Sequence, residues 1–286
     1  MKLSVYTLVC PEYSLSEAAA GVARHGIPGI EWRVGRAGSD ADFDPRDPQR
    51  FWKANRATLP ADDLANAARE AAKITADSGL EASFLAGNVQ PGDLDALKLH
   101  LEAARTLGAP AIRVGTGGPE DEDLGRAFDV ARGSWDAVEK LASEAGVKAV
   151  VEIHHFSLMP SASAARRFMD GRDPACCGVL YDPGNMAFEG YERPDYALQM
   201  IRPWLAHVHV KSARPRVTGA DERQCLKWQL DSCGLREGIV DWAAQVEALK
   251  ACGYSGYLSL EDFNAATQAE EKLGDFADLF RDLLAD

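Results

Sequence analysis

The chain of 286 residues lacks the features that mark several classes of protein. No apolar run approaches the roughly 18 residues that a membrane-spanning helix needs, so we expect no membrane partner. The six cysteines form no CxxC pair and show no zinc-knuckle spacing, which predicts reduced thiols that serve as small apolar side chains. The opening run MKLSVYTL is too short and too weakly basic for a secretory signal. We therefore expect a cytoplasmic protein.

Basic residues are scarce relative to acidic ones. The chain has 31 Lys and Arg against 44 Asp and Glu, which gives a formal net charge of −13. Such a surface repels phosphate backbones at long range, and we expect no nucleic-acid partner. The hydrophobic share of 46% is that of an ordinary globular protein, and the chain is long enough for a large core.

Short β-rich segments alternate with helical patterns along the whole chain. The eight predicted strands cover residues 5–9, 29–34, 80–86, 111–115, 147–153, 177–182, 205–211 and 256–261. Eight strand–helix units predict a single α/β domain over residues 1–286, a (β/α)8 TIM barrel. An open doubly wound sheet is the alternative, but the chain has no glycine-rich phosphate motif of the kind such sheets carry.

Two strand-to-helix connections, residues 35–60 and 212–238, are much longer than the others. Long loops at the C-terminal end of a barrel usually build the functional site. Phe51, Trp52 and Trp228 in these loops are candidates to cover a ligand, and packing within the loops is the alternative.

Polar side chains recur on the inward face near the ends of four consecutive predicted strands. Because side chains alternate across a strand, His209 faces the barrel axis while its apolar neighbours face the helices. The same alternation turns Glu152 and Glu261 inward, and Asp182 ends the sixth strand. Three carboxylates crowded in a low-dielectric mouth repel one another strongly, and a divalent cation is the usual solution. Oxygen ligands with one imidazole suit Mn²⁺, our first choice, or Mg²⁺, Co²⁺ or Zn²⁺.

Further inward-facing side chains are candidates for catalysis or binding. His154 shares a face with Glu152, whereas His207 lies deeper and is expected to be a hydrogen-bonded core histidine. Lys211 lies one pleat beyond His209 and is expected to contact a substrate hydroxyl or carbonyl. An arginine here binds a substrate anion or neutralises a buried acid. The remaining candidates for substrate binding are Glu31, Arg113, His155, Asn185 and Arg214.

At these residues the sequence resembles the xylose isomerase-like barrel superfamily, the sugar phosphate isomerase/epimerase group. The matching segments are VEIH at 151–154, YDPGN at 181–185, HVHVK at 207–211, SLED at 259–262, and GIVDW at 238–242 ahead of GYSGY at 253–257. The resemblance implies that Glu152, Asp182, His209 and Glu261 bind the metal. In the ketose 3-epimerases of this group, the two glutamates also act as acid and base on opposite faces of the substrate.

The resemblance implies a divalent-metal-dependent sugar isomerase or epimerase that abstracts a proton next to a metal-bound carbonyl. The expected partner is a small sugar or keto-sugar. Barrels of this kind often pair, so a homo-oligomer is also expected.

Departures from the epimerase pattern keep a second activity open. Asn185 stands where the epimerases have a histidine, and no arginine aligns cleanly after His209. His154 and His155 form an extra pair that can donate or accept protons. These features fit a metal-dependent lyase acting on a keto-sugar or keto-cyclitol, such as an inosose dehydratase or an enzyme that eliminates the aglycone of a 3-keto-glycoside.

Two further readings are weaker. An apurinic-site endonuclease needs a richer histidine cluster and a basic groove, and this chain has six histidines and a net charge of −13. A non-catalytic sugar-binding barrel would have no use for both glutamates.

Overall fold

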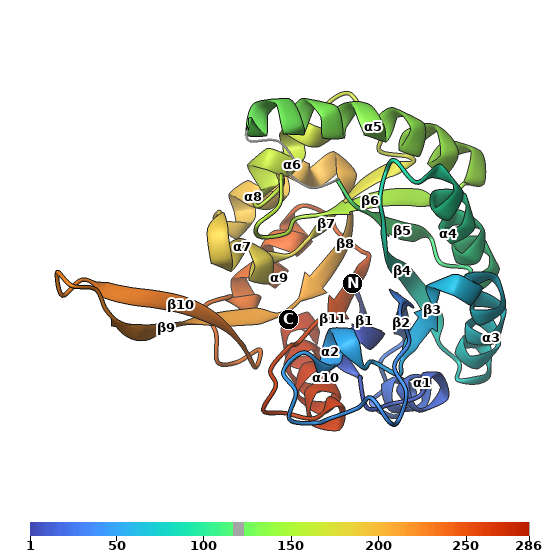
Figure 1. The fold of residues 1–286 in the computed structure, drawn as a ribbon, viewed down its shortest axis with the longest axis horizontal. Coiled ribbons are helices and arrows are strands. Elements are labelled where there is room, and N and C mark those ends of the chain that lie inside the picture. Colours follow the sequence, from blue (N-terminus) through green and yellow to red (C-terminus); the bar gives the residue numbers. More distant parts are fainter. Residues whose placement is uncertain (117–122, 286) are drawn as a thin grey trace.

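Parallel strands close into a barrel in the computed structural model, which describes residues 1–116 and 123–285 (Figure 1). Strand β1 pairs with both β2 and β11, and this pairing closes the ring. The short β3 (Thr58–Pro60) adds to the edge of β2. The barrel strands are β1 (Lys2–Tyr6), β2 (Gly29–Gly35), β4 (Glu81–Val89), β5 (Ala111–Val114), β6 (Lys148–Glu152), β7 (Cys177–Tyr181), β8 (Leu205–Val210) and β11 (Tyr257–Leu260). The predicted (β/α)8 fold is confirmed.

Helices surround the barrel on its outer side (Figure 1). No helix within the described residues is long and apolar enough to cross a bilayer. The outer helices are α1 (Leu15–Arg24), α3 (Leu64–Asp77), α4 (Leu94–Leu107), α5 (Leu124–Ala145), α6 (Ala162–Met169), α8 (Pro194–Ile201), α9 (Trp242–Ala251) and α10 (Ala269–Ala285). Three single turns of 3-10 helix are η1 (Thr7–Val9), η2 (Ala61–Asp63) and η3 (Arg202–Trp204).

Local sequence signals set several helix ends. Ser14 and Glu17 form the predicted capping box at the start of α1, where each side chain accepts a hydrogen bond from the other residue's backbone N–H. Gly108 and Gly146 end α4 and α5 in the left-handed conformation, with φ of 72° and 64°. Glycine adopts this conformation without the steric penalty of a Cβ.

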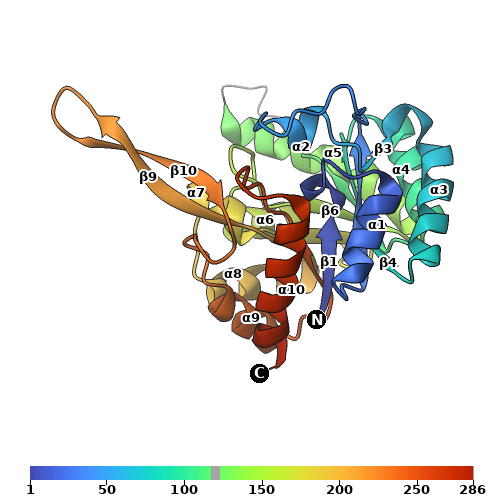
Figure 2. The same cartoon turned by 90° about the horizontal axis from the view of Figure 1, so that it is seen from below.

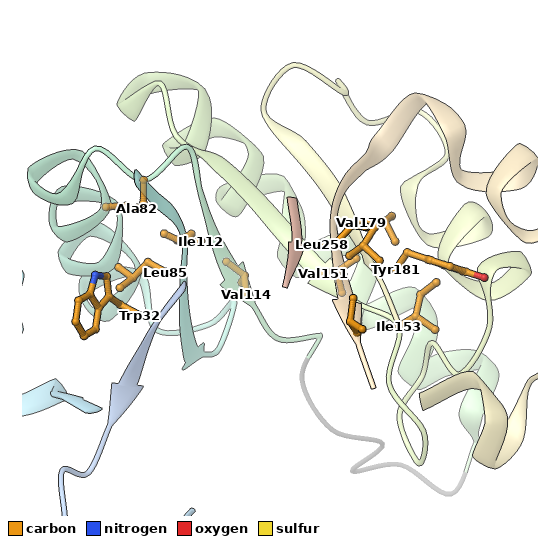
Figure 3. Close-up of a cluster of buried hydrophobic side chains, with 14 of the residues drawn as sticks. Trp32, Ala82, Leu85, Ile112, Val114, Val151, Ile153, Val179, Tyr181 and Leu258 are labelled. Carbon is orange, nitrogen blue, oxygen red and sulfur yellow. The ribbon is translucent and has the colours of Figure 1, made fainter. Parts of the chain in front are cut away.

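Apolar side chains fill the layer between the barrel and its helices (Figure 3). Val151 and Val179 of neighbouring strands are fully or almost fully buried there, as are Trp32 and Ile112 on the other side of the barrel. Burial of side chains of this size stabilises a fold by roughly 1.5–3 kcal/mol each. Because alternate residues of each strand serve this outer core, the residues between them point inward and are available for a site.

Both long connections contain more regular structure than the sequence predicted. Residues 35–60 include the short helix α2 (Arg50–Lys53) as well as β3. Residues 212–233 form an antiparallel ribbon of β9 (Ser212–Ala220) and β10 (Leu226–Cys233), which projects far from the barrel (Figures 1 and 2). The connection at 212–238 is long, as predicted, but most of it is a ribbon in which the two halves of the segment pair with each other.

A further helix, α7 (Pro183–Glu189), was not predicted. The Asp182 side chain accepts a hydrogen bond from the Asn185 backbone N–H, and Pro183 occupies the first turn of the helix. Proline suits this position because its missing N–H would have no partner there. The thiols were expected to serve as small apolar side chains. Cys233 is buried, as this predicts, whereas Cys225 is exposed.

Lys272 of α10 is buried and ties this helix to the segment after β11. Its Nζ donates a hydrogen bond to the Asp262 carbonyl over 2.8 Å and lies 4.5 Å from the centre of the Phe51 ring. Burial lowers the pKa of the Lys272 ammonium to about 8, and nearby Arg50 acts in the same direction. The groups that oppose this shift are Asp262, Cys10 and Glu12.

We predict that Lys272→Met removes a pH-dependent part of the folding free energy. The folded pKa of about 8 lies below the unfolded value of 10.5, so the folded state loses this proton first and the wild type gains stability as pH rises between these values. Urea denaturation at pH 7.5 and 9.5 should show the wild type gaining about 2 kcal/mol relative to the variant. Equal changes in both proteins would contradict the prediction.

Candidate metal centre

Four neighbouring strands place an acidic cluster at one end of the barrel. Glu152 ends β6, Asp182 follows β7, His209 lies in β8, and Glu261 follows β11. These strands are consecutive in the ring, so their ends converge. One ligand atom from each of the four residues lies within 4.8 Å of all the others. The structure thus brings the four predicted metal ligands together.

The ring of His209 is oriented by a carboxylate below it. Its Nε2 lies 3.1 Å from a Glu31 oxygen, and the other Glu31 oxygen is 2.8 Å from Nε2 of His207. A carboxylate accepts hydrogen bonds, so Nε2 of His209 carries the proton and donates it. All three side chains are buried. Glu31 therefore sets which nitrogen of His209 faces the acidic cluster.

The other nitrogen of His209 has no hydrogen-bond partner among the described residues. Nδ1 lies 3.4 Å from a Glu152 oxygen, 3.7 Å from an Asp182 oxygen and 3.2 Å from a Glu261 oxygen. Burial lowers the pKa of His209, but Glu261 and Glu31 outweigh it and raise this pKa well above its usual value, so positive charge is needed at Nδ1. In the metal-free protein that charge is a proton on the imidazole. A divalent ion that takes its place among the three carboxylates would leave the ring neutral, in the tautomer that Glu31 sets.

The donor set fits a divalent cation. Ligands about 2.1 Å from an octahedral ion are about 3 Å apart, close to the separations around Nδ1. Three carboxylates with one imidazole suit Mn²⁺, Mg²⁺, Co²⁺ or Zn²⁺. The geometry supports a divalent metal but does not select one of these ions. Mn²⁺ stays a prediction.

Two cations of the chain flank the carboxylates. Arg113 donates to Glu152 over 2.7 Å, and Lys211 forms ion pairs with Asp182 (2.8 Å) and Glu261. Burial alone would raise the pKa of Glu152 and of Glu261. It is outweighed at Glu152 by Arg113 and His209, and at Glu261 by His209 and Lys211, so both pKa values are lowered. Both glutamates are therefore ionised at neutral pH.

Asn185 connects the cluster to a histidine on the cavity wall. Its Nδ2 donates to Asp182 over 2.8 Å and to Glu152 over 3.2 Å, and its Oδ1 lies 2.8 Å from Nδ1 of His155. The amide is fully buried. Asn185 therefore orients two of the candidate ligands. It also borders the cavity above the cluster, so the substrate contact stays a prediction.

A cavity of about 1130 Å³ opens above the cluster. Glu152, Glu261 and Lys211 line its floor, and the side chains of His154 and His155 stack on each other on its wall with ring centres 4.4 Å apart. The base of the β9–β10 ribbon also contributes to the lining. The cavity exceeds the 300–1,000 Å³ typical of small-molecule sites, so it has room for a substrate beside the metal.

A family model described as the xylose isomerase-like TIM barrel matches residues 20–283. The chain belongs to this family. Among curated proteins, an inosose dehydratase of Bacillus anthracis (strain CDC 684 / NRRL 3495) is 36% identical over 78 residues. That match spans 27% of this chain and 26% of the relative, so about a quarter of the relative's length is covered.

Two solved structures share the fold over the whole chain. The apo form of 3-keto-D-glucoside 4-epimerase, YcjR, from E. coli has a TM-score of 0.68 and 19% identity, with 100% of both chains covered. The IolI protein, solved with a bound zinc atom, has a TM-score of 0.69 and 17% identity, with 100% of this chain and 98% of that chain covered. At these identities the likeness shows the fold.

Two predicted substrate contacts are corrected by the structure. Glu31 is fully buried below the cluster and is occupied by His207 and His209, so it cannot reach a substrate. Arg214 lies on the ribbon, where it pairs with Glu237 over 3.2 Å outside the cavity lining. Its cross-strand partner Asp231 lines the cavity, whereas Arg214 does not. The expectation that His207 is a hydrogen-bonded core residue is confirmed.

The other predicted residues border the cavity. Arg113 both lines it and neutralises the buried Glu152, so the two roles considered for this arginine are combined. His154 is exposed to the cavity, and His155 is half-buried. Of the aromatics proposed to cover a ligand, Trp52 lines the cavity, Phe51 is buried behind it, and Trp228 lies outside on the ribbon.

Sequence reasoning missed Phe263, the partner of Trp52 in an aromatic wall. The rings of Trp52 and Phe263 lie 4.8 Å apart on the cavity wall, and Lys211 Nζ lies 5.4 Å from the centre of Phe263. Phe263 follows Glu261 by two residues, and extension of the strand alternation would have identified it. Arg33 was expected to face inward, like Glu31 on the same strand, and it lines the cavity, where its guanidinium donates to the Thr58 hydroxyl and the Trp52 carbonyl.

We predict that Glu31→Gln weakens divalent-metal binding by about 10- to 100-fold with the fold intact. The neutral amide keeps the shape but no longer fixes the proton of His209 on Nε2. Titration of Mn²⁺ or Zn²⁺ into the apo-protein measures the affinity, and Glu237→Gln, an exposed carboxylate, is the matched control. Unchanged affinity in Glu31→Gln would show that His209 is oriented by other means.

Proposed function

We propose that this protein is a metal-dependent enzyme that removes a proton from the carbon next to a ketone of a sugar or cyclitol. The observation that supports this most is the unpartnered Nδ1 of His209, which faces three carboxylates at the floor of a large cavity. When bound there, a divalent ion supplies Lewis-acid polarisation of a substrate carbonyl. The inosose dehydratase match and the keto-glucoside epimerase neighbour act on keto-sugars or keto-cyclitols by name, which agrees with this proposal.

Glu152 and Glu261 are the candidate proton carriers. They come from strands separated in the ring by β7 and β8, and both line the cavity. Each is ionised, as a base must be before it accepts a proton from carbon. Lys211 contacts Glu261 and can hold a substrate oxygen or stabilise the charge that develops on an enediolate.

The placement of two glutamates on different sides of the centre favours isomerisation or epimerisation. One glutamate takes the proton from carbon, and the other delivers a proton to the opposite face or to the neighbouring carbon. Reprotonation of carbon leaves the mass of the substrate unchanged.

A second candidate is dehydration, supported by the stacked pair of His154 and His155. His154 is exposed to the cavity, and the one hydrogen bond of its ring within residues 1–116 and 123–285 is between Nδ1 and the His155 carbonyl, at 2.7 Å. An imidazole in this position can protonate a leaving hydroxyl after Glu152 or Glu261 has removed the α-proton. The inosose dehydratase match favours the same outcome.

Incubation of the Mn²⁺-loaded protein in D₂O with ketoses, inososes and 3-keto-glycosides tests the proposal. Deuterium gain with no other change of mass supports isomerase or epimerase activity, and loss of water or an aglycone supports a lyase. Glu261→Gln should lower the rate of either reaction by about 10²- to 10⁴-fold. Metal content is measured in parallel, so that loss of the base is distinguished from loss of the ion. Absence of deuterium exchange with every substrate would contradict the proposal.

His154→Gln separates the two candidates. If the protein is a dehydratase, the variant should keep exchanging the α-proton with solvent while elimination slows by about 10²-fold or more. If it is an isomerase or epimerase, both rates should stay within a few-fold of the wild type. Exchange and product formation are followed in the same sample by NMR.

A further inference from the structure

The β9–β10 ribbon is an amphipathic element with one face uncovered. Residues paired directly across antiparallel strands point to the same side, and here Trp228 pairs with Val217 and Leu226 with Ala220. Trp228 is 60% exposed, Leu226 58% and Val217 44%. On the opposite face Arg216 forms an ion pair with Asp231. One face is thus satisfied by its own ion pair, and the other presents apolar side chains to solvent.

The ribbon has little support from its own barrel. Within β9 and β10 only Ser212, Ala213 and Cys233, at the base, are buried. The remainder extends into solvent away from the helices (Figures 1 and 2). A two-stranded ribbon alone is marginally stable in water and needs a packing partner for its apolar face.

A second uncovered apolar surface lies close to the base of the ribbon. Phe156 is 80% exposed, and its backbone adopts a φ of 56°, a conformation that is unfavourable for a residue with a side chain. Its N–H donates to the Glu189 carboxylate at the end of α7. The neighbours His154, His155 and Ser157 line the cavity, but Phe156 does not. The strained backbone therefore holds this ring outside the cavity lining, in edge contact with the ring of His155.

The two surfaces lie on the same side of the molecule. Helix α7 packs against β9 and lies beside the base of the ribbon in Figure 1, and Glu189 links α7 to Phe156. A two-fold axis on this side lets each of two copies place its ribbon on the other's Phe156, which is the reciprocal pairing of a closed dimer.

Charge favours a second copy as the occupant. The ribbon, residues 212–233, has four Lys and Arg and three Asp and Glu, whereas the rest of the chain has 27 and 41. The ribbon is thus slightly basic and the rest of the chain strongly acidic. An arm of this charge is attracted to the body of an identical chain more than to another basic arm.

We propose that this protein forms a two-fold dimer in which the apolar face of each β9–β10 ribbon, with Val217, Leu226 and Trp228, docks on the surface around Phe156 of the second copy. This interface is independent of the proposed chemistry, because none of these four side chains lines the cavity.

Analytical ultracentrifugation of the full chain over a range of concentrations tests the dimer. The wild type should sediment as a dimer, and Leu226→Ser with Trp228→Ser should raise the dissociation constant at least tenfold. Phe156→Ser should have a similar effect from the other side of the interface. Tyr196→Ser on α8, an aromatic residue that is 49% exposed, is the matched control and should leave the dimer intact. Circular dichroism confirms that each variant is folded.

Cys225 at the end of the ribbon supplies a test of geometry. It is the exposed cysteine of the six, and Cys252→Ala removes the half-buried one. A maleimide–benzophenone probe on Cys225, in a mixture of ¹⁴N- and ¹⁵N-labelled chains, should give cross-linked peptides of mixed isotope that include the segment around Phe156 or α7. A protein that is monomeric at every concentration, a dimer that survives the ribbon variants, or cross-links within single chains only would each overturn the proposal.

Discussion

The position of His209 Nδ1 among three carboxylates is the constraint on which the site depends. Glu31 accepts the proton of Nε2, and Glu152, Asp182 and Glu261 surround Nδ1. Three carboxylates in a buried layer are tolerated only with positive charge close by. Arg113 and Lys211 supply part of it from the chain, and the geometry leaves the centre suited to a divalent ion.

The apolar layer of the barrel offsets the desolvation of these charged side chains. Outward residues such as Val151 and Val208 pack against the helices, while inward residues of the same strands carry Glu152 and His209. Apolar burial over the whole outer layer offsets the desolvation of a few carboxylates in the mouth. The same division explains why the site lies at strand ends, where the large cavity admits a substrate and the core below stays closed.

The arrangement also separates two functions within the C-terminal loops. The long connection through α2 brings Trp52 against Phe263 and shapes the cavity wall, whereas the connection after β8 leaves the barrel as a ribbon. The base of that ribbon borders the cavity, including Leu230 on the same face as Trp228, whereas Val217, Leu226 and Trp228 lie outside the cavity. One loop therefore shapes the cavity wall, and the other carries the surface that we propose for association.

The sequence by itself determined which strands carry the inward-facing charged residues and where several helices end. Alternation in β6, β8 and β11 was sufficient to point Glu152, His209 and Glu261 inward, and Gly108 and Gly146 marked helix ends, because these signals are local. Only the tertiary structure decided that Glu31 accepts a hydrogen bond from His209 and that Arg113 pairs with Glu152. It also decided that Arg214 lies on a ribbon and pairs with Glu237. Each of these depends on contacts between residues about 20 to 180 positions apart, and side-chain periodicity carries no information about which distant elements meet.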